Sequence, residues 1–94
     1  MGEPESRYAV PATVVFQDLG DETVLLDLEN GEYFAVDGTG KRIWDCLVEG
    51  KTPGQVVAML AAEFEVGEEV ARQDLGKFVA ELLHRGLLRP AVTP

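Results

Sequence analysis

The fold is decided by residues 24–40, which read VLLDLENGEYFAVDGTG. Two runs of aliphatic, β-branched and aromatic residues, 23–28 and 32–36, flank the dipeptide Asn30-Gly31. Asn-Gly between two such runs favours a β-hairpin, because both residues accept the positive φ that a tight turn requires. After residue 36 a glycine-rich turn follows, and the spacing of apolar residues changes from two to about 3.6. The stretch therefore predicts a hairpin that leads into a helix.

One more strand is predicted upstream of the hairpin. Residues 13–16, TVVF, form a short β-branched and aromatic run, and the turn-forming cluster Asp18-Leu19-Gly20-Asp21 closes it. Together the three runs predict a three-stranded antiparallel meander. In its second strand, Val24, Leu26 and Leu28 alternate onto one face.

Three helices are predicted downstream. Thr39 is expected to cap the first, which runs to about Val48, and Thr52-Pro53 places a capping hydroxyl before a proline at the first helical position of the second. The third runs from Glu68 to about Arg85 and ends at Gly86. The apolar stripes of the three helices are Ile43, Trp44, Leu47 and Val48; Val56, Val57, Leu60, Ala61 and Phe64; and Ala71, Leu75, Phe78, Val79, Leu82 and Leu83.

These elements predict an α+β fold in which a three-stranded antiparallel sheet is followed by three helices, similar to a winged helix-turn-helix. A chain of 94 residues has room for one core. We expect one domain over residues 12–89, a flexible arm over residues 1–11 and a tail over residues 90–94. Leu87 and Leu88 are expected to pack back on the core.

Composition excludes several classes of function. The net charge of −9 disfavours proteins that bind duplex DNA or anionic membranes, since both depend on clustered positive charge. Nine acidic residues and one basic residue lie in residues 1–37, whereas residues 38–94 are nearly neutral. No apolar run is long enough to span a bilayer, and no secretory signal is recognisable, so a cytoplasmic protein is expected.

No catalytic, metal or cofactor site is predicted. The single cysteine, Cys46, lies on an apolar stripe far along the chain from the single histidine, His84, so burial is a better interpretation than nucleophilic catalysis. A metal site would lack companion ligands. An enzyme that uses Cys46 and a winged-helix DNA-binding regulator remain alternatives, although the charge of the third helix argues against the latter.

The last predicted strand, Glu32–Val36, has only one sequence neighbour in the sheet, so its other edge is expected to be open. Open strand edges recruit extended peptides. Tyr33 and Phe34 point to opposite faces of this strand. On a helical wheel of the third helix, one side of the apolar stripe is bordered by Asp74, Phe78, Glu81 and Arg85, and the other side by Arg72, Val79 and Leu83.

Residues 24–40, followed by Ile43-Trp44, Glu49-Gly50-Lys51-Thr52 and a closing helix with Asp74, Leu75, Phe78, Leu82 and Gly86-Leu87-Leu88, resemble the PqqD-like family, also called RiPP recognition elements. The resemblance covers about residues 14–88. Val36-Asp37 stands where the family usually has Leu-Asn, a conservative change that leaves the expected fold unaltered.

The resemblance implies a non-catalytic protein that binds the leader of a ribosomal precursor peptide by strand addition and needs no cofactor. It implies a monomer that works with a leader peptidase and a cyclase of lasso-peptide biosynthesis, or alternatively a PqqD-type chaperone that presents a precursor to a radical enzyme. The implied peptide-binding residues are Glu32, Tyr33, Phe34, Ala35 and Val36 on the strand and Arg72, Asp74, Leu75, Phe78, Val79 and Leu82 on the third helix.

Overall fold

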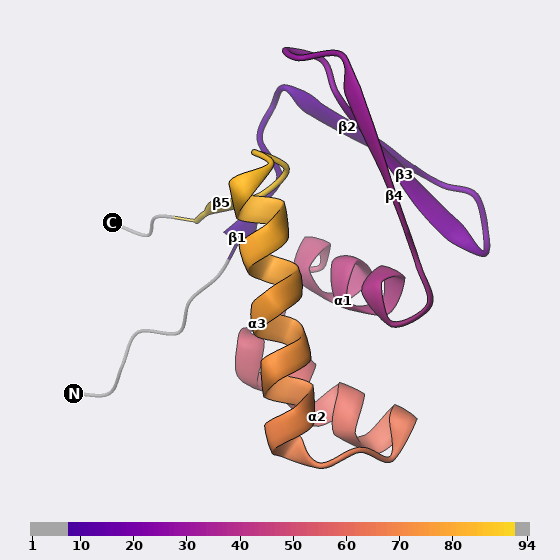
Figure 1. Cartoon of the computed structure of the whole chain (residues 1–94), viewed down its shortest axis with the longest axis vertical. Helices are drawn as coiled ribbons and strands as arrows, with labels where there is room; N and C mark the ends of the chain where they lie inside the picture. Colours follow the sequence, from indigo (N-terminus) through magenta and orange to yellow (C-terminus); the bar gives the residue numbers. More distant parts are fainter. Residues whose placement is uncertain (1–7, 92–94) are drawn as a thin grey trace.

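The computed structural model describes residues 8–91 and contains two small sheets and three helices (Figure 1). The larger sheet has the order β2-β3-β4 and is antiparallel throughout. The elements are β1 (Tyr8–Ala9), β2 (Val14–Asp18), β3 (Glu22–Asp27), β4 (Glu32–Asp37), α1 (Gly38–Val48), α2 (Pro53–Phe64), α3 (Glu68–His84) and β5 (Arg89–Pro90). The predicted α+β class, with a three-stranded meander followed by three helices, is confirmed.

The two faces of the larger sheet differ in burial. Thr23, Leu25 and Asp27 of β3 point into the protein, and Leu25 is wholly buried. The alternating set predicted from the sequence, Val24, Leu26 and Leu28, does share a face, but Leu26 and Leu28 are exposed on the opposite side. We call the side that carries Val24 and Leu26 the outer face. The helices cover the inner face.

The core forms between the inner face and the three helices. α1 packs directly beneath the sheet, against β3 and β4, and α2 packs against both α1 and α3. Trp44 of α1 lies at the centre with no exposed surface, and the ring of Phe16 meets it edge-on at 5.3 Å between centroids. The predicted stripes supply most of the core, whose buried apolar members are Val14, Leu25, Val36, Ile43, Trp44, Cys46, Leu47, Val56, Val57, Leu60, Ala71, Leu75, Val79, Leu82, Leu87 and Leu88.

Helix starts follow the predicted signals except in α1. Thr52 caps α2 through a capping box in which its hydroxyl accepts from the Gln55 amide and the Gln55 side chain accepts from the Thr52 amide. In α1 the N-cap is Asp37, and Thr39 lies inside the first turn. The prediction that Thr39 caps α1 was therefore wrong: Gly38, at φ 55°, turns the chain from β4 into the helix without a linker.

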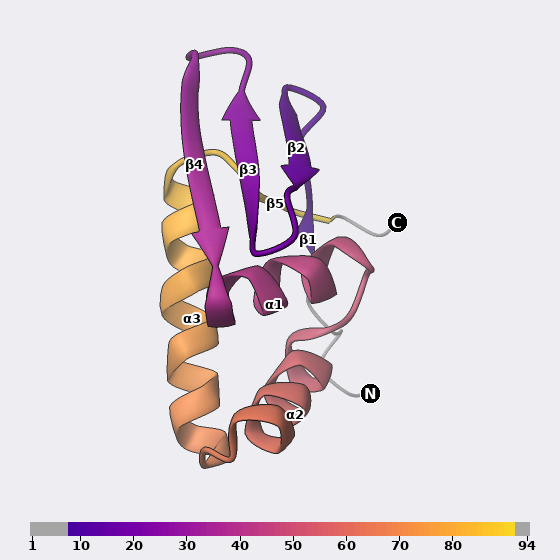
Figure 2. The same ribbon diagram turned by 90° about the vertical axis from the view of Figure 1, so that its right-hand side faces the viewer.

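Both ends of the described chain lie in the second sheet. β1 pairs antiparallel with β5, with Tyr8 opposite Pro90 and Ala9 opposite Arg89 (Figure 2). The predicted flexible arm over residues 1–11 thus differs from the structure at residues 8 and 9, which form a strand. Residues 1–7 and 92–94 lie outside the described residues. Pairing with β5, far away in sequence, explains why local composition did not indicate this strand.

Candidate functional site

The free edge of β4 carries main-chain groups that no strand of residues 8–91 pairs, since β4 has β3 as its only neighbour. The amide of Leu28 donates to the Thr13 carbonyl and that of Leu19 donates to the Glu22 carbonyl, so the even-numbered residues of β3 face β2. The odd-numbered residues therefore face β4. With Leu25 opposite Phe34, β4 bonds to β3 through residues 32, 34 and 36. Tyr33 and Ala35 consequently direct their N–H and C=O groups to the open edge.

A stripe of side chains on α3 accompanies this edge. Asp74, Phe78, Glu81 and Arg85 follow one another at intervals of three and four residues, which places them on one side of the helix. From first to last the stripe spans about 16 Å at 1.5 Å per residue. Six residues of β4 span about the same length at 3.3 Å per residue. The strand edge and the helix stripe are therefore matched in length.

One contact joins the stripe to β4. At the C-terminal end of α3, the Arg85 guanidinium lies 4.7 Å from the centroid of the Phe34 ring and is also bound by the Glu81 carboxylate. A small recess there is lined by Asp27, Glu32, Tyr33, Phe34, Arg85 and Leu87. Phe34 is half-buried, whereas Tyr33 on the opposite face is 72% exposed, as the alternation of the strand predicts.

At the other end, the first turn of α1 and the middle of α3 border an open hollow of about 350 Å³. Its lining consists of Thr39, Gly40, Ile43, Asp74, Lys77 and Phe78. Gly40 lets the Phe78 ring approach closely, because a Cβ built on this glycine would lie 3.1 Å from ring atom Cε1. An aromatic floor beside Lys77 and Asp74 suits an apolar side chain with polar neighbours.

We call the β4 edge, the recess beside Arg85 and the hollow beside α1 together the groove. The structure brings only part of the predicted helix wall to this groove. Asp74 and Phe78 lie in the hollow beside α1. Arg72, Leu75 and Val79 line a different cavity, which they share with Tyr8 and Pro53. Leu82 has no exposed surface and is a core residue. The helical wheel divides the residues in the same way, with Asp74 and Phe78 on one side and Arg72 and Val79 on the other, whereas the resemblance implied peptide-binding residues from both sides.

The prediction omitted groove residues on both helices. Arg85 and Lys77 reach the two ends of the groove from α3, and Thr39, Gly40 and Ile43 reach it from α1. The wheel position of Arg85, beside Asp74 and Phe78, was a usable signal. No local signal places the first turn of α1 there, because its position depends on how α1 packs under β4.

The two residues considered for catalysis lie away from the groove lining. Cys46 is buried, and desolvation by this burial raises the pKa of its thiol, which disfavours the reactive thiolate. His84 is exposed in the last turn of α3. Within residues 8–91, His, Cys, Asp and Glu form no group of three or more that could hold a metal ion. None of the helices described here is long and apolar enough to cross a membrane.

The sequence model of the family of coenzyme PQQ synthesis protein D (PqqD) matches residues 22–88, from β3 to the residues after α3. The chain belongs to the PqqD family. No curated protein is similar enough in sequence to be matched. The resemblance to the PqqD family that the sequence indicated is therefore confirmed.

Two solved structures share the fold of this PqqD family member. One is TbiB1 in complex with the TbiA(beta) leader peptide, with a TM-score of 0.84 and 36% identity over 90% of this chain and 99% of that chain. The other is a lasso peptide synthetase B1 complexed with the leader peptide, with a TM-score of 0.84 and 27% identity over 89% of this chain and 99% of that one. Both are peptide complexes of proteins that match this chain over nearly their whole length.

Proposed function

We propose that this protein binds the leader segment of a ribosomal precursor peptide as an added strand on β4, in lasso-peptide biosynthesis. The observation that carries the proposal is the open edge of β4, where Tyr33 and Ala35 direct main-chain donors and acceptors outward beside a stripe of equal length on α3. Main-chain bonds of this kind give affinity, and pockets for alternate side chains give specificity. The similarity to two leader-peptide complexes supports this choice.

The proposed site comprises the β4 residues Glu32 to Val36, with Asp74, Phe78 and Arg85 on α3. A peptide side chain that points toward α3 would enter the hollow above Phe78 or approach Arg85 beside Phe34. Arg72, Leu75, Val79 and Leu82 support the fold in this proposal and do not contact the peptide. Catalysis and a cofactor have no part in it.

We further propose that the protein, as a monomer, delivers the bound precursor to a leader peptidase and a cyclase. Such a carrier needs no chemistry of its own: it fixes the leader and so raises the effective concentration of the precursor at the enzyme. The match to PqqD supports one alternative within the same mechanism, namely presentation of a precursor to a radical enzyme.

Titration of the protein with a synthetic leader peptide tests strand addition. Ala35→Pro removes an N–H that faces the open edge and leaves the β3–β4 hydrogen bonds intact. We expect this variant to bind the leader about tenfold more weakly or worse, because a main-chain bond is lost and the proline ring obstructs the added strand. Isothermal titration calorimetry provides the measurement.

Ala35→Val is the matched control, since it keeps the N–H and suits a strand. Circular dichroism and thermal unfolding must first show that both variants are folded. Saturable binding of equal strength by the wild type and a folded Ala35→Pro variant would contradict strand addition on β4. Failure of the wild type to bind the leader of its own pathway at tens of micromolar would contradict the proposed function.

A further inference from the structure

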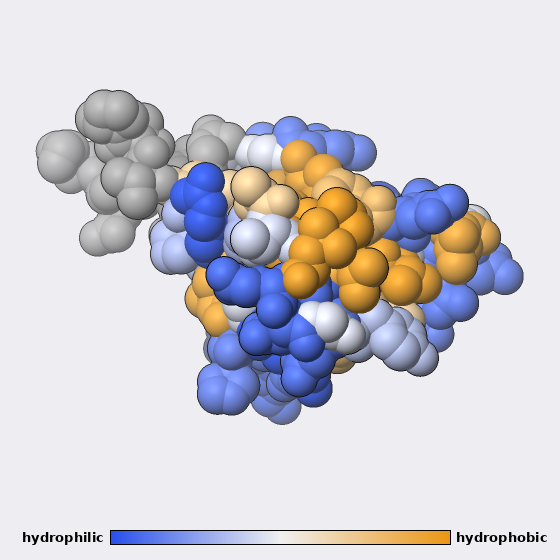
Figure 3. Space-filling view, turned by 90° about the horizontal axis from the view of Figure 1, so that it is seen from above, coloured by the Kyte–Doolittle hydropathy of each residue, from blue (hydrophilic) through white to orange (hydrophobic). Residues whose placement is uncertain are grey.

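The outer face of the larger sheet presents apolar side chains that no described element covers. In register across the three strands lie Val15, Leu26 and Tyr33, which are 47%, 37% and 72% exposed. Val24 lies in the next row, and Leu19 and Leu28 extend the apolar area at the strand ends with 55% and 57% exposure. Figure 3, which views the molecule from the end that carries the larger sheet, shows hydrophobic residues gathered together with hydrophilic residues around them.

This face is hollowed as well as apolar. An open depression of about 430 Å³ is lined by Val15, Phe16, Gln17, Leu19, Val24 and Leu26. α1 packs on the other side of the sheet, against β3 and β4, so the depression is not part of the core. An exposed apolar depression with a polar border is typical of a protein–protein contact surface.

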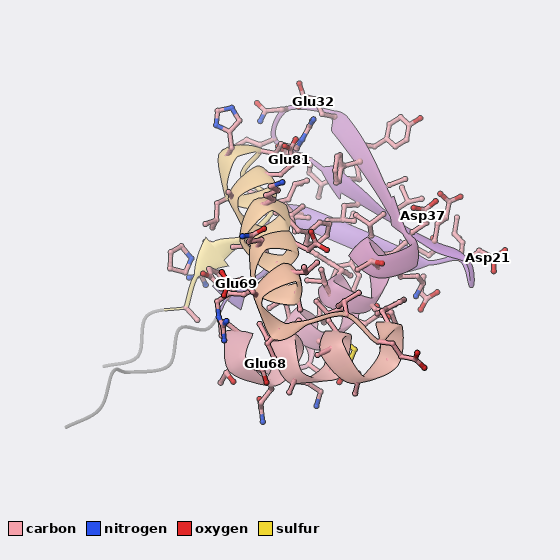
Figure 4. The ribbon with its side chains drawn as sticks, turned by 60° about the horizontal axis from the view of Figure 1, so that its bottom comes forward. Asp21, Glu32, Asp37, Glu68, Glu69 and Glu81 are labelled. Atoms are coloured by element: carbon pink, nitrogen blue, oxygen red, sulfur yellow. The ribbon has the colours of Figure 1, made fainter. Side chains whose placement is uncertain are left out.

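The charges around the face point to one kind of occupant. Residues 14–37 contain seven carboxylates and neither lysine nor arginine. Glu22 of β3 lies directly opposite Asp37 of β4, and like charges so placed destabilise a sheet. Figure 4 shows Asp21 and Asp37 at one end of the sheet, so carboxylates border the apolar area there, whereas Glu32 at the other end lies on the Phe34 side of β4, in the recess beside Arg85.

A second copy of this chain would fit the face poorly, because a two-fold contact through it would bring carboxylates against carboxylates. Lys41, the cation nearest in sequence to β4, is already bound by Asp18 and Asp45 at 2.9 and 3.2 Å. A partner with lysine or arginine around an apolar centre would instead relieve the repulsion between Glu22 and Asp37.

The outer face is also continuous with the proposed peptide edge. Tyr33 and Ala35 present their side chains on the outer face and their free main-chain groups at the β4 edge. A strand added there would widen the sheet, and every second peptide side chain would join the outer face. A protein seated on this face would therefore touch both the carrier and its peptide.

We propose that the outer face of β2-β3-β4 is the docking surface for the enzyme that cleaves the leader, and that this enzyme contacts it with an apolar surface bordered by lysine and arginine. That enzyme acts on the same leader that β4 holds, whereas a cyclase acts on the remainder of the precursor. The choice of occupant rests on the proposed function. The surface itself rests on exposure, register and charge.

Binding of the purified leader peptidase to the leader-loaded protein tests the proposal. Leu26→Asp places a charge at the centre of the face, and Val15→Asp is a second variant in the same row in case the first fails to fold. We expect either folded variant to bind the peptidase at least about tenfold more weakly, because an apolar contact is replaced by a carboxylate that must be desolvated. Both should bind the leader peptide as the wild type does.

Val70→Asp is the matched control, since Val70 is 48% exposed on α3, away from the sheet. This variant should bind the peptidase within about twofold of the wild type. Glu22→Gln with Asp37→Asn should slow peptidase association at low ionic strength and have little effect at high ionic strength.

Three results would overturn the proposal. The first is equal peptidase binding by Leu26→Asp, Val15→Asp and the wild type. The second is that these variants lose binding to the purified cyclase and keep binding to the peptidase. The third is a wild-type dimer in sedimentation experiments that Leu26→Asp dissociates, which would assign the face to a second copy. If the wild type fails to bind the leader peptide, the proposed function is contradicted. Binding of the peptidase to the peptide-free protein and its variants then still tests whether the outer face is a docking surface.

Discussion

At the residue scale, Gly40 controls how closely α1 approaches Phe78. A Cβ on this glycine would lie 3.1 Å from the ring, closer than most side-chain carbons come to a neighbour. The ring is half-buried and lines the hollow, so a shift of the ring would change the space that the hollow offers to a peptide side chain. One methyl group at Gly40 is therefore expected to change the shape of the hollow.

We predict that Gly40→Ala weakens leader binding several-fold, because the displaced Phe78 ring fills part of the hollow. Gly54→Ala is the matched control, since Gly54 is in the first turn of α2 and a Cβ there meets nothing within 4 Å. Alanine in a helix gains about 0.5–1 kcal/mol over glycine, so the control should be more stable and bind normally. Calorimetric titration and urea unfolding provide the measurements. Normal binding by Gly40→Ala would contradict this role for Phe78.

The residues of the groove show what the sequence can and cannot predict. Periodicity was enough to place Asp74, Phe78 and Arg85 on one side of α3, because a helical wheel needs only the spacing. The contact between Arg85 and Phe34 joins residues about fifty positions apart and depends on how α3 lies against the sheet. Leu75 and Val79, which the resemblance implied as peptide-binding residues, line a cavity with Tyr8, whose strand the sequence did not indicate.

At the element scale, the β3–β4 hairpin is closed by the side chain of Asp27. One carboxylate oxygen accepts from the amides of Glu29 and Asn30 at 3.0 and 3.3 Å, and the other accepts from Asn30 Nδ2 at 2.8 Å. The Asn30 side-chain bond above all, with the two amide bonds, holds the pKa of Asp27 below its ordinary value of 3.8. This hairpin positions β4, so Asp27 supports the peptide edge indirectly.

We predict that Asp27 stabilises the fold in a pH-dependent way. Because its pKa is lowered by folding, the stabilisation is complete above 3.8 and is lost as the pH falls through the folded-state pKa. Asp27→Asn should be less stable than the wild type at neutral pH, and the difference in stability should shrink at a pH well below 3.8. Urea unfolding at both pH values is the measurement, with Glu29→Gln as a control that removes a charge from the same turn. If the wild type and Asp27→Asn differed in unfolding free energy by the same amount at both pH values, the prediction would be contradicted.

The same element shows why burial on a sheet is hard to predict. Residues 24–28 of the β3 region are apolar at every position except Asp27, so alternation alone does not identify the inner face. Packing of Leu25 against the helices determines which face of β3 is buried, and it leaves Leu26 and Leu28 on the outer face. The hairpin itself was predictable, because its Asn-Gly turn is a local signal.

At the scale of the whole molecule, charge is divided between sheet and helices. The excess of acidic residues lies in residues 1–37, and Figure 4 shows three of them, Asp21, Glu32 and Asp37, at the two ends of the larger sheet. A field of this kind accelerates the encounter with cationic partners more than it strengthens the final complex.

We predict that leader peptides with lysine or arginine beside the β4-binding segment associate faster at low ionic strength. The effect should fade as salt shortens the screening length to about 8 Å at physiological ionic strength. Stopped-flow fluorescence of a labelled peptide gives the rates, and a peptide with the lysines replaced by norleucine is the control. A rate that is independent of salt for both peptides would show that the acidity does not steer peptide binding.

The pairing of β1 with β5 has a practical consequence for joining this domain to other proteins. Tyr8 sits opposite Pro90, so both described ends emerge together, and Figure 2 shows this pair on the side of the molecule away from β4. A tether attached before β1 or after β5 would start from the same place and leave the β4 edge uncovered. The fold can therefore be fused to an enzyme in either order, or circularly permuted through a short loop, with the same orientation of the groove.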